Sequence, residues 1–98
     1  MFDLKKIVGF EWDKGNIDKS YKKHGIIPNE AEEVFLDEDT LLLEDTKHSK
    51  QEERFEAIGK IIKGSILFLA FTIREDKIRI ISARTANKKE RRRYEKKP

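Results

Sequence analysis

The chain contains no cysteine and only two histidines among its 98 residues. A protein without a thiol has no disulfide framework, no thiolate zinc site and no cysteine nucleophile. The two histidines, His24 and His48, stand in different sequence contexts, which also disfavours a zinc site. We therefore expect a protein without a bound metal or another cofactor, and the lack of cysteine is compatible with a reducing cytoplasm.

Long hydrophobic runs are also missing from the sequence. No apolar run approaches the roughly 20 residues that a membrane-spanning helix needs, and the N-terminus lacks the apolar region of a signal peptide. We expect a cytoplasmic protein without a membrane partner, folded as a single domain over residues 1–98. A chain of this size buries about two thirds of its unfolded surface, which supports one modest core and leaves little room for a deep pocket.

Charged residues make up 42% of the chain, but the two signs are separated along it. Residues 29–57 contain eleven Asp and Glu against three Lys and Arg. Residues 84–98 contain eight Lys and Arg against two Glu. A clustered basic end is typical of a phosphate-binding surface and also of a solvated, charged helix, and the sequence leaves both open.

The first third of the chain has the pattern of one strand and two helices. Residues 8–12 are predicted to form an edge strand, and Asp13 is a suitable N-cap for the helix that follows. Ile17, Tyr21 and His24 share one face of that helix, Tyr21 is expected in the core or at its edge, and Gly25 suits a left-handed residue that ends the helix. Pro28 predicts the start of a second helix. The short apolar face of this helix contains Ala31, Val34 and Phe35.

The remainder of the chain has the pattern of four strands and a helix. The strands are predicted over residues 40–43, 55–62, 66–73 and 77–83, with turns at Lys63-Gly64 and Glu75-Asp76. Residues 66–73 are apolar on both faces, so this strand belongs in the sheet interior. Asn87 is a suitable cap for the final helix. The pattern indicates an α+β fold with two N-terminal helices packed on a mainly antiparallel sheet of four to five strands, followed by a C-terminal helix.

Three blocks of the sequence resemble the signatures of the BrnT family of toxins. They occur in order across nearly the whole chain. The first is Phe10-Glu11-Trp12-Asp13 with Lys23-His24-Gly25, Glu30-Ala31 and Val34-Phe35; the second is His48-Ser49 with Glu52-Glu53-Arg54-Phe55 and Ile58-Gly59; the third is Arg79-Ile80-Ile81-Ser82-Ala83-Arg84 with Ala86, Glu90 and Tyr94. Ser65 departs from the family, which often has a basic residue there, so no phosphate contact is carried over to this position.

The resemblance implies a RelE-like fold and a bacterial type II toxin that inhibits translation by cutting RNA. It implies a metal-independent endoribonuclease of the mRNA interferase type. It also implies a hetero-oligomer with a BrnA-like antitoxin that carries a ribbon-helix-helix DNA-binding part. In such cleavage a base removes the proton of a ribose 2′-hydroxyl, the oxygen attacks the neighbouring phosphorus, and an acid protonates the leaving 5′ oxygen. Cations facing the phosphorane stabilise its charge.

Arg84 is the leading candidate for a catalytic cation. It ends the last strand and the third signature, and we expect an exposed side chain there. The alternative is a structural salt bridge at the end of the sheet. Arg79 lies an odd number of residues away, so it points to the other face of a regular strand, and only a bulge brings both arginines to one site. Arg79 could bind RNA or bridge acidic surface residues.

His48, Glu53 and Arg54 are further catalytic candidates. An unperturbed imidazole titrates near pH 6.5, which suits His48 for proton transfer, and the alternative is a solvated side chain in a polar loop. Arg54 could clamp a phosphate while Glu53 acts as a base, or the two could form a structural ion-pair network. His24, at a helix end, we interpret as structural, since an imidazole there can bond the last carbonyls.

The basic C-terminal helix supplies the remaining candidates for RNA contacts, which are Lys88, Arg91, Arg92 and Tyr94. Tyr94 could stack on a base or anchor the helix to the sheet. Two other functions stay open from the residues alone. One is a nucleic-acid-binding module without catalysis, and the other is a protein-interaction module whose acidic segment, residues 29–37, and basic tail bind oppositely charged partners.

Overall fold

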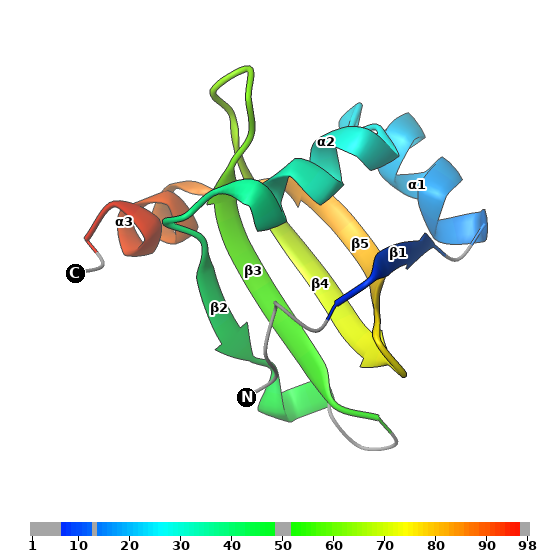
Figure 1. Ribbon diagram of the computed structural model, residues 1–98. Helices are drawn as coiled ribbons and strands as arrows, with labels where there is room; N and C mark the ends of the chain where they lie inside the picture. The colour runs from blue at the N-terminus through cyan, green and yellow to red at the C-terminus, as the bar shows by residue number, and fades with distance from the viewer. Residues whose placement is uncertain (1–6, 13, 49–51, 97–98) are drawn as a thin grey trace.

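The computed structural model describes residues 7–12, 14–48 and 52–96, which form an α+β fold around a five-stranded mixed sheet (Figure 1). The strands are β1 (Gly9–Trp12), β2 (Leu41–Glu44), β3 (Arg54–Lys60), β4 (Ile66–Arg74) and β5 (Lys77–Thr85). The helices are α1 (Lys14–His24), α2 (Pro28–Glu33) and α3 (Lys88–Lys96), with 3-10 turns η2 (Val34–Leu36) and η3 (Thr46–His48).

The strand order β1-β5-β4-β3-β2 places β4 at the centre of the sheet. This confirms the interior position predicted from the apolar run at residues 66–73. β2 to β5 pair antiparallel in the order in which they follow along the chain, whereas β1 pairs parallel with β5 at the opposite edge. β1 is separated from β5 by two helices and three strands along the chain, so its direction is not set by a hairpin.

The two faces of the sheet differ in how they are covered. The main core lies on the face packed by α2 and η2, which we call the covered face, and Ala31, Val34 and Phe71 are fully buried there. α1 lies beside α2, against β5 (Figure 1). The other face, which we call the open face, is covered only at one end, where α3 packs Tyr94 against Ile58 in a second, smaller cluster.

Most of the predicted turns and helix ends are confirmed. Gly25 has a φ of 68° and donates its amide to the carbonyl of Tyr21, which ends α1 in the left-handed conformation. Asn87 Oδ1 accepts the amide of Glu90 at 2.8 Å, and the Glu90 carboxylate accepts the amide of Asn87 at 2.9 Å. This capping box starts α3. The turn glycine Gly64 has a φ of 102°.

The prediction that Tyr21 lies in the core or at its edge is wrong. Tyr21 is 58% exposed, and His24 is also exposed. α1 contacts the sheet beside its edge strand β5, so only part of the helix circumference is covered. The side chain of Ile17 and the predicted cap Asp13 lie outside the described residues. In the described part of the chain, no helix is long and apolar enough to cross a membrane.

Gly59 lets η2 approach the sheet closely. A Cβ at this position would lie 2.6 Å from Thr40 Oγ1 and 2.8 Å from Val34 Cγ1. Real Cβ atoms do not approach other heavy atoms this closely, so a larger residue would push η2 from β3. The Thr40 hydroxyl donates to the carbonyl of Val34 and fixes the same contact.

We predict that Gly59→Ala destabilises the protein by about 1–3 kcal/mol, the usual cost of overpacking a core. Thermal melting should show a midpoint lower by at least about 4 °C. Gly9→Ala is the matched control, because a Cβ at Gly9 meets nothing within 4 Å. A Gly59→Ala protein that melts at the wild-type temperature would show that η2 moves away without cost.

Candidate active site

The open face carries three rows of side chains that run across β3, β4 and β5. Paired residues of neighbouring antiparallel strands point to the same face. The strand register gives the rows Arg54–Thr72–Arg79, Glu56–Ala70–Ser82 and Ile58–Phe68–Arg84. The first row holds an arginine on each flank and the third ends in Arg84 beneath α3. The middle row combines one carboxylate with two short side chains.

A bulge at Ile81 brings Arg79 and Arg84 to the same face. Phe71 pairs with Ile80 while Ala70 pairs with Ser82, so Ile81 is the extra residue of β5. The alternation of side chains shifts by one after it. Sequence spacing predicted opposite faces for a regular strand, and the bulge is the irregularity that this prediction named as its exception.

Arg84 is held by contacts on several sides. Its Nη1 and Nη2 donate to the two carboxylate oxygens of Glu90 at 2.7 and 2.8 Å, and its guanidinium lies 4.3 Å from the ring centroid of Phe68. The hydrogen bonds that Arg84 donates to Glu90 raise the pKa of Arg84, although burial opposes this. Burial raises the pKa of Glu90, but the hydrogen bonds from Arg84 and from the Asn87 amide lower it by more. Arg84 is therefore half-buried and not exposed as predicted, and the salt bridge at the end of the sheet, which was the alternative, is present.

Glu56 is a titratable group that the sequence analysis did not single out. It is half-buried at the centre of the open face. Burial raises its pKa, the negative charges of Asp45 and Glu90 raise it further, and Arg93 and Arg84 act in the opposite direction. A carboxyl group in this state can exchange a proton more readily near neutral pH than an exposed one. The signal in the sequence is the alternation of Arg54 and Glu56 with apolar residues in β3.

Arg54 lies at the far end of the open face from Arg84, and Glu53 directly precedes it, before β3 begins. With Glu44 and Thr46 they line a depression of about 330 Å³. His48 ends η3, two residues after Thr46, but its side chain lies outside the described residues.

The four catalytic candidates therefore do not form one contact cluster. Thr72 pairs with Arg54 and Phe68 pairs with Arg84, so the rows of the two arginines lie four residue steps apart along β4. At roughly 3.3 Å per residue this separation is about 13 Å. Arg79 pairs with Thr72 in the same row as Arg54, and its Nη1 lies 3.7 Å from Glu11 Oε2, the acidic bridge that was one of its two predicted roles.

The contacts of Tyr94 support the anchoring alternative. The side chain is 9% exposed, and its hydroxyl donates to Asp37 Oδ2 at 2.5 Å. Burial and this hydrogen bond raise the tyrosine pKa. Asp37 also accepts the amide of Lys60, so it joins α3 to β3. The RNA stacking predicted as one role of Tyr94 lacks an exposed ring, whereas Lys88, Arg91 and Arg92 are exposed on α3.

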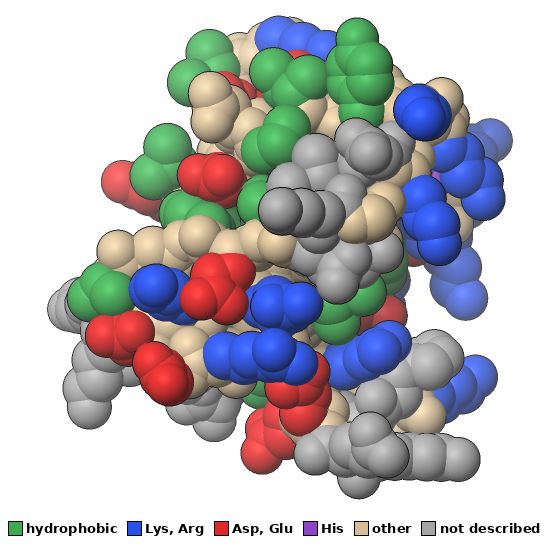
Figure 2. Space-filling view, turned by 90° about the vertical axis from the view of Figure 1, so that its right-hand side faces the viewer, with side chains coloured by type: hydrophobic (Ala, Val, Ile, Leu, Met, Phe, Trp, Pro, Cys, Tyr) green, Lys and Arg blue, Asp and Glu red, His purple; other side chains and the backbone are tan. Residues whose placement is uncertain are grey.

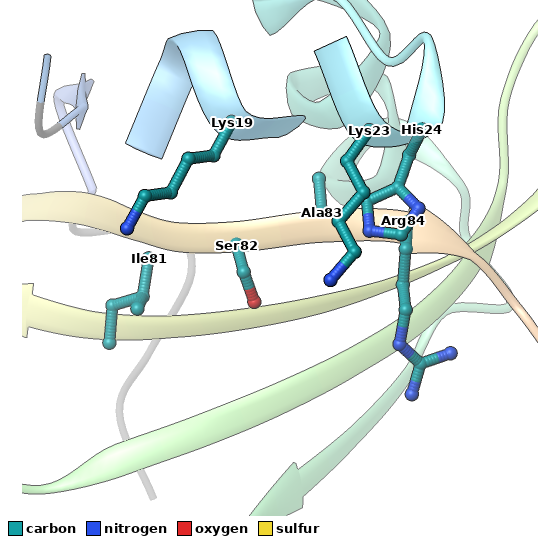
Figure 3. Close-up of a pocket in the computed structure, with 7 residues that line it drawn as sticks. All are labelled: Lys19, Lys23, His24, Ile81, Ser82, Ala83 and Arg84. Atoms are coloured by element: carbon teal, nitrogen blue, oxygen red, sulfur yellow. The ribbon is translucent and has the colours of Figure 1, made fainter. Parts of the chain in front are cut away.

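A second depression of about 210 Å³ lies between α1 and the outer edge of β5, and we call it the α1–β5 groove (Figure 3). Lys19, Lys23 and His24 border it from α1, and Arg84 borders it from β5. None of these α1 residues was among the sequence-derived site candidates, because α1 reads as a local helix end with favourable cations. Among the described residues, no group of three His, Asp or Glu side chains is arranged to hold a metal ion.

Comparison with known proteins identifies the family. Residues 12–90 match the family model described as the ribonuclease toxin BrnT of type II toxin-antitoxin systems. The chain belongs to the BrnT family. It is accordingly a ribonuclease toxin whose target is RNA and whose partner is an antitoxin. The match ends at Glu90, so it includes the open face and the α1–β5 groove but not the later part of α3.

The fold is similar to a solved BrnT structure. The crystal structure of the Brucella abortus ribonuclease toxin BrnT superposes with a TM-score of 0.64 at 21% sequence identity, over 83% of this chain and 99% of that chain. At this identity the likeness concerns the fold. A comparison with curated proteins gives no match.

The raised pKa of Glu56 predicts a pH-dependent effect of Glu56→Gln on stability. Above the unfolded pKa of 4.5 the wild-type carboxylate ionises more easily in the unfolded chain, so folding loses stability as the pH rises through the folded pKa. Glu56→Gln should therefore melt higher than wild type at neutral pH, and the difference should vanish below pH 4.5.

Thermal melting at several pH values measures this difference. Glu38→Gln makes the same charge change at an exposed loop residue and should shift stability by less than about half a kcal/mol at every pH. A Glu56→Gln variant that is less stable than wild type at neutral pH would mean that the carboxylate is stabilised by its arginine neighbours.

Proposed function

We propose that this BrnT protein is a metal-independent endoribonuclease of the mRNA interferase type that cuts RNA on the open face and so inhibits translation in the bacterial cytoplasm. The observation that carries the proposal is the middle of that face, where Glu56 lies in the row between those of Arg54 and Arg84 and its carboxyl is influenced by Asp45 and Glu90 as well as by Arg93 and Arg84. One proton-exchanging carboxyl beside several cations is what cleavage by a ribose 2′-hydroxyl requires. The RelE-like character of the fold belongs to the same proposal.

In this mechanism the RNA supplies the nucleophile. Glu56 accepts the 2′-hydroxyl proton, the 2′ oxygen forms a bond to the adjacent phosphorus, and the bond from phosphorus to the 5′ oxygen breaks. The products are a 2′,3′-cyclic phosphate and a 5′-hydroxyl, whose proton comes from an acid. Glu53 and His48, at the Arg54 end of the sheet, remain candidates for proton transfer. The small side chains of Ala70 and Ser82 favour approach of the phosphate beside Glu56.

Arg84 is the proposed cation at the phosphorane. Glu90 and Phe68 fix its guanidinium before RNA binds, so little reorganisation is needed in the transition state. Arg54 and Arg79 flank the next row and would bind neighbouring phosphates bidentately. Lys88, Arg91 and Arg92 would add electrostatic attraction from exposed positions on α3.

Cleavage of labelled RNA in the presence of a chelator tests the mechanism. We expect the wild type to remain active. Arg84→Ala should slow cleavage by about a hundred-fold or more, and Glu56→Gln should slow it by about a hundred- to ten-thousand-fold. Arg84→Lys keeps the charge without the planar fork and should fall between wild type and Arg84→Ala.

Melting must accompany these rates, because Arg84 also has a structural partner. The Glu90 carboxylate is only 14% exposed, and loss of its partner should cost about 1–3 kcal/mol in Arg84→Ala. Arg74→Ala is the matched control, since it removes an exposed arginine paired with Glu52 at the end of β4 and should cut RNA at the wild-type rate. Wild-type cleavage by folded Arg84→Ala would refute the role of Arg84. Salt-sensitive RNA binding without any cleavage would favour a non-catalytic binding module.

The antitoxin partner is proposed to be BrnA-like, with a ribbon-helix-helix DNA-binding part, and to form a hetero-oligomer with this chain. The support is the type II family together with a cationic surface that an inhibitor would have to mask. Lys and Arg side chains gather on the right-hand side of the view in Figure 2. An acidic or apolar antitoxin segment over this surface would block access of RNA directly.

We predict that bacteria producing this chain alone stop growing and that co-production of such an antitoxin restores growth. Arg84→Ala produced alone should be tolerated, because it lacks the proposed catalytic cation. Growth curves together with the amount of soluble protein measure the effect. Normal growth of cells that contain abundant, folded wild-type protein would contradict the prediction.

A further inference from the structure

The α1–β5 groove exists because β1 stops before β5 does. β1 pairs with β5 only as far as Trp12 and Ile80, one residue before the bulge. Beyond that point no strand pairs with the outer edge of β5 in the described part of the chain, and α1 borders this edge (Figure 1). The groove floor is formed by residues 81–84 and its rim by the C-terminal half of α1.

Two lysines line the groove, and among the described residues neither has a carboxylate partner. Lys19 and Lys23 are four residues apart on one face of α1, and both side chains extend toward β5 (Figure 3). Of the seven described residues that line the groove, none is acidic. Within the described part of the chain, no carboxylate lies within 4.0 Å of either lysine ammonium. Like charges at this spacing repel each other, so a bound anion would stabilise the helix as well as the complex.

Arg84 connects this groove to the open face. Its backbone lies in the bulged part of β5 that floors the groove, and its guanidinium reaches the side of the sheet where Phe68 and Glu56 lie. An RNA strand could place one phosphate beside Arg84 on the open face. If it then crossed the edge of β5, its next phosphate would lie near Lys23 and Lys19. Ser82 lies at this edge, between the open face and the α1–β5 groove, and its short side chain obstructs the path little.

We propose that the α1–β5 groove binds a phosphodiester of single-stranded RNA next to the one that is cut. The ligand is a phosphate of the substrate backbone, held by Lys19 and Lys23 with His24 at the rim. This inference rests on the proposed cleavage of RNA at the open face. Each lysine ammonium is a compact charge that attracts the RNA backbone and does not contact bases. The groove therefore contributes affinity but no preference for a base sequence.

Binding of an uncleavable RNA tests the groove independently of catalysis. The probe is a short fluorescent RNA with every ribose 2′-O-methylated, which removes the nucleophile and leaves the phosphates. Loss of one phosphate contact makes the plot of log association constant against log salt concentration less steep by about 0.7 for a single strand. This corresponds to about a four-fold loss of affinity near 0.15 M salt. Lys23→Gln and Lys19→Gln should each show this loss.

Lys22→Gln is the matched control. It removes the same charge from the same helix, but Lys22 does not line the groove. The salt dependence of RNA binding by Lys22→Gln should equal that of the wild type. Equal losses of affinity in Lys22→Gln and Lys23→Gln would mean that only net charge matters, and they would overturn the proposal. Unchanged RNA binding by Lys23→Gln would also overturn the proposal. If this variant binds RNA normally but binds the antitoxin more weakly, the groove is assigned to the antitoxin.

Cleavage kinetics separate the groove from the reaction centre. A contact made equally in the substrate complex and in the transition state changes KM and leaves kcat unchanged. Lys23→Gln should therefore raise KM about four-fold with wild-type kcat, and a fall in kcat would overturn the assignment as a flanking site. If the wild type binds the uncleavable probe through Lys23 but cuts no RNA, the proposed function fails while the groove assignment stands.

Discussion

One inserted residue in β5 determines the arrangement of the charged side chains. With Ile81 left unpaired, Ile80 and Ala83 are both buried in the main core, while Ser82 and Arg84 point to the open face with Arg79. A regular strand would direct Arg84 into the apolar core, where an unpaired guanidinium is very unfavourable. The bulge follows directly on the last residue paired with β1, so the face that collects the arginines and the groove beside α1 arise from the same irregularity.

The Glu90 carboxylate has both a structural role and a proposed functional role. It accepts two hydrogen bonds from Arg84 and one from the Asn87 amide that starts α3. The same carboxylate therefore caps a helix and orients the proposed catalytic cation. Tyr94 anchors the other part of α3 through Asp37, so the helix is fixed at both ends over the apolar end of the open face. A cation held in this way is oriented before a phosphate binds, but its charge is offset by Glu90 and it cannot be removed without a cost in stability.

The elements of the fold were predictable because their signals are local. A glycine that adopts positive φ ends α1, an asparagine caps α3, and an apolar run identifies the central strand β4. The errors concern relations between distant segments. The burial predicted for Tyr21 failed because helical periodicity gives a face but not how much of it the sheet covers. The exposure predicted for Arg84 failed because its partner Glu90 belongs to a different element.

The sequence by itself determined the family signatures, the order of strands and helices, and the candidate arginines, because these depend on residue type and spacing along the chain. Tertiary structure alone decided which of those residues lie together. It placed Glu56 in the row between those of Arg54 and Arg84, separated these two arginines by about 13 Å along β4, and set Lys19 and Lys23 beside an edge of β5 left without a neighbouring strand. The physical reason is that a charge is felt across a few ångströms of space, and strand pairing and a single bulge decide which distant residues come within that range.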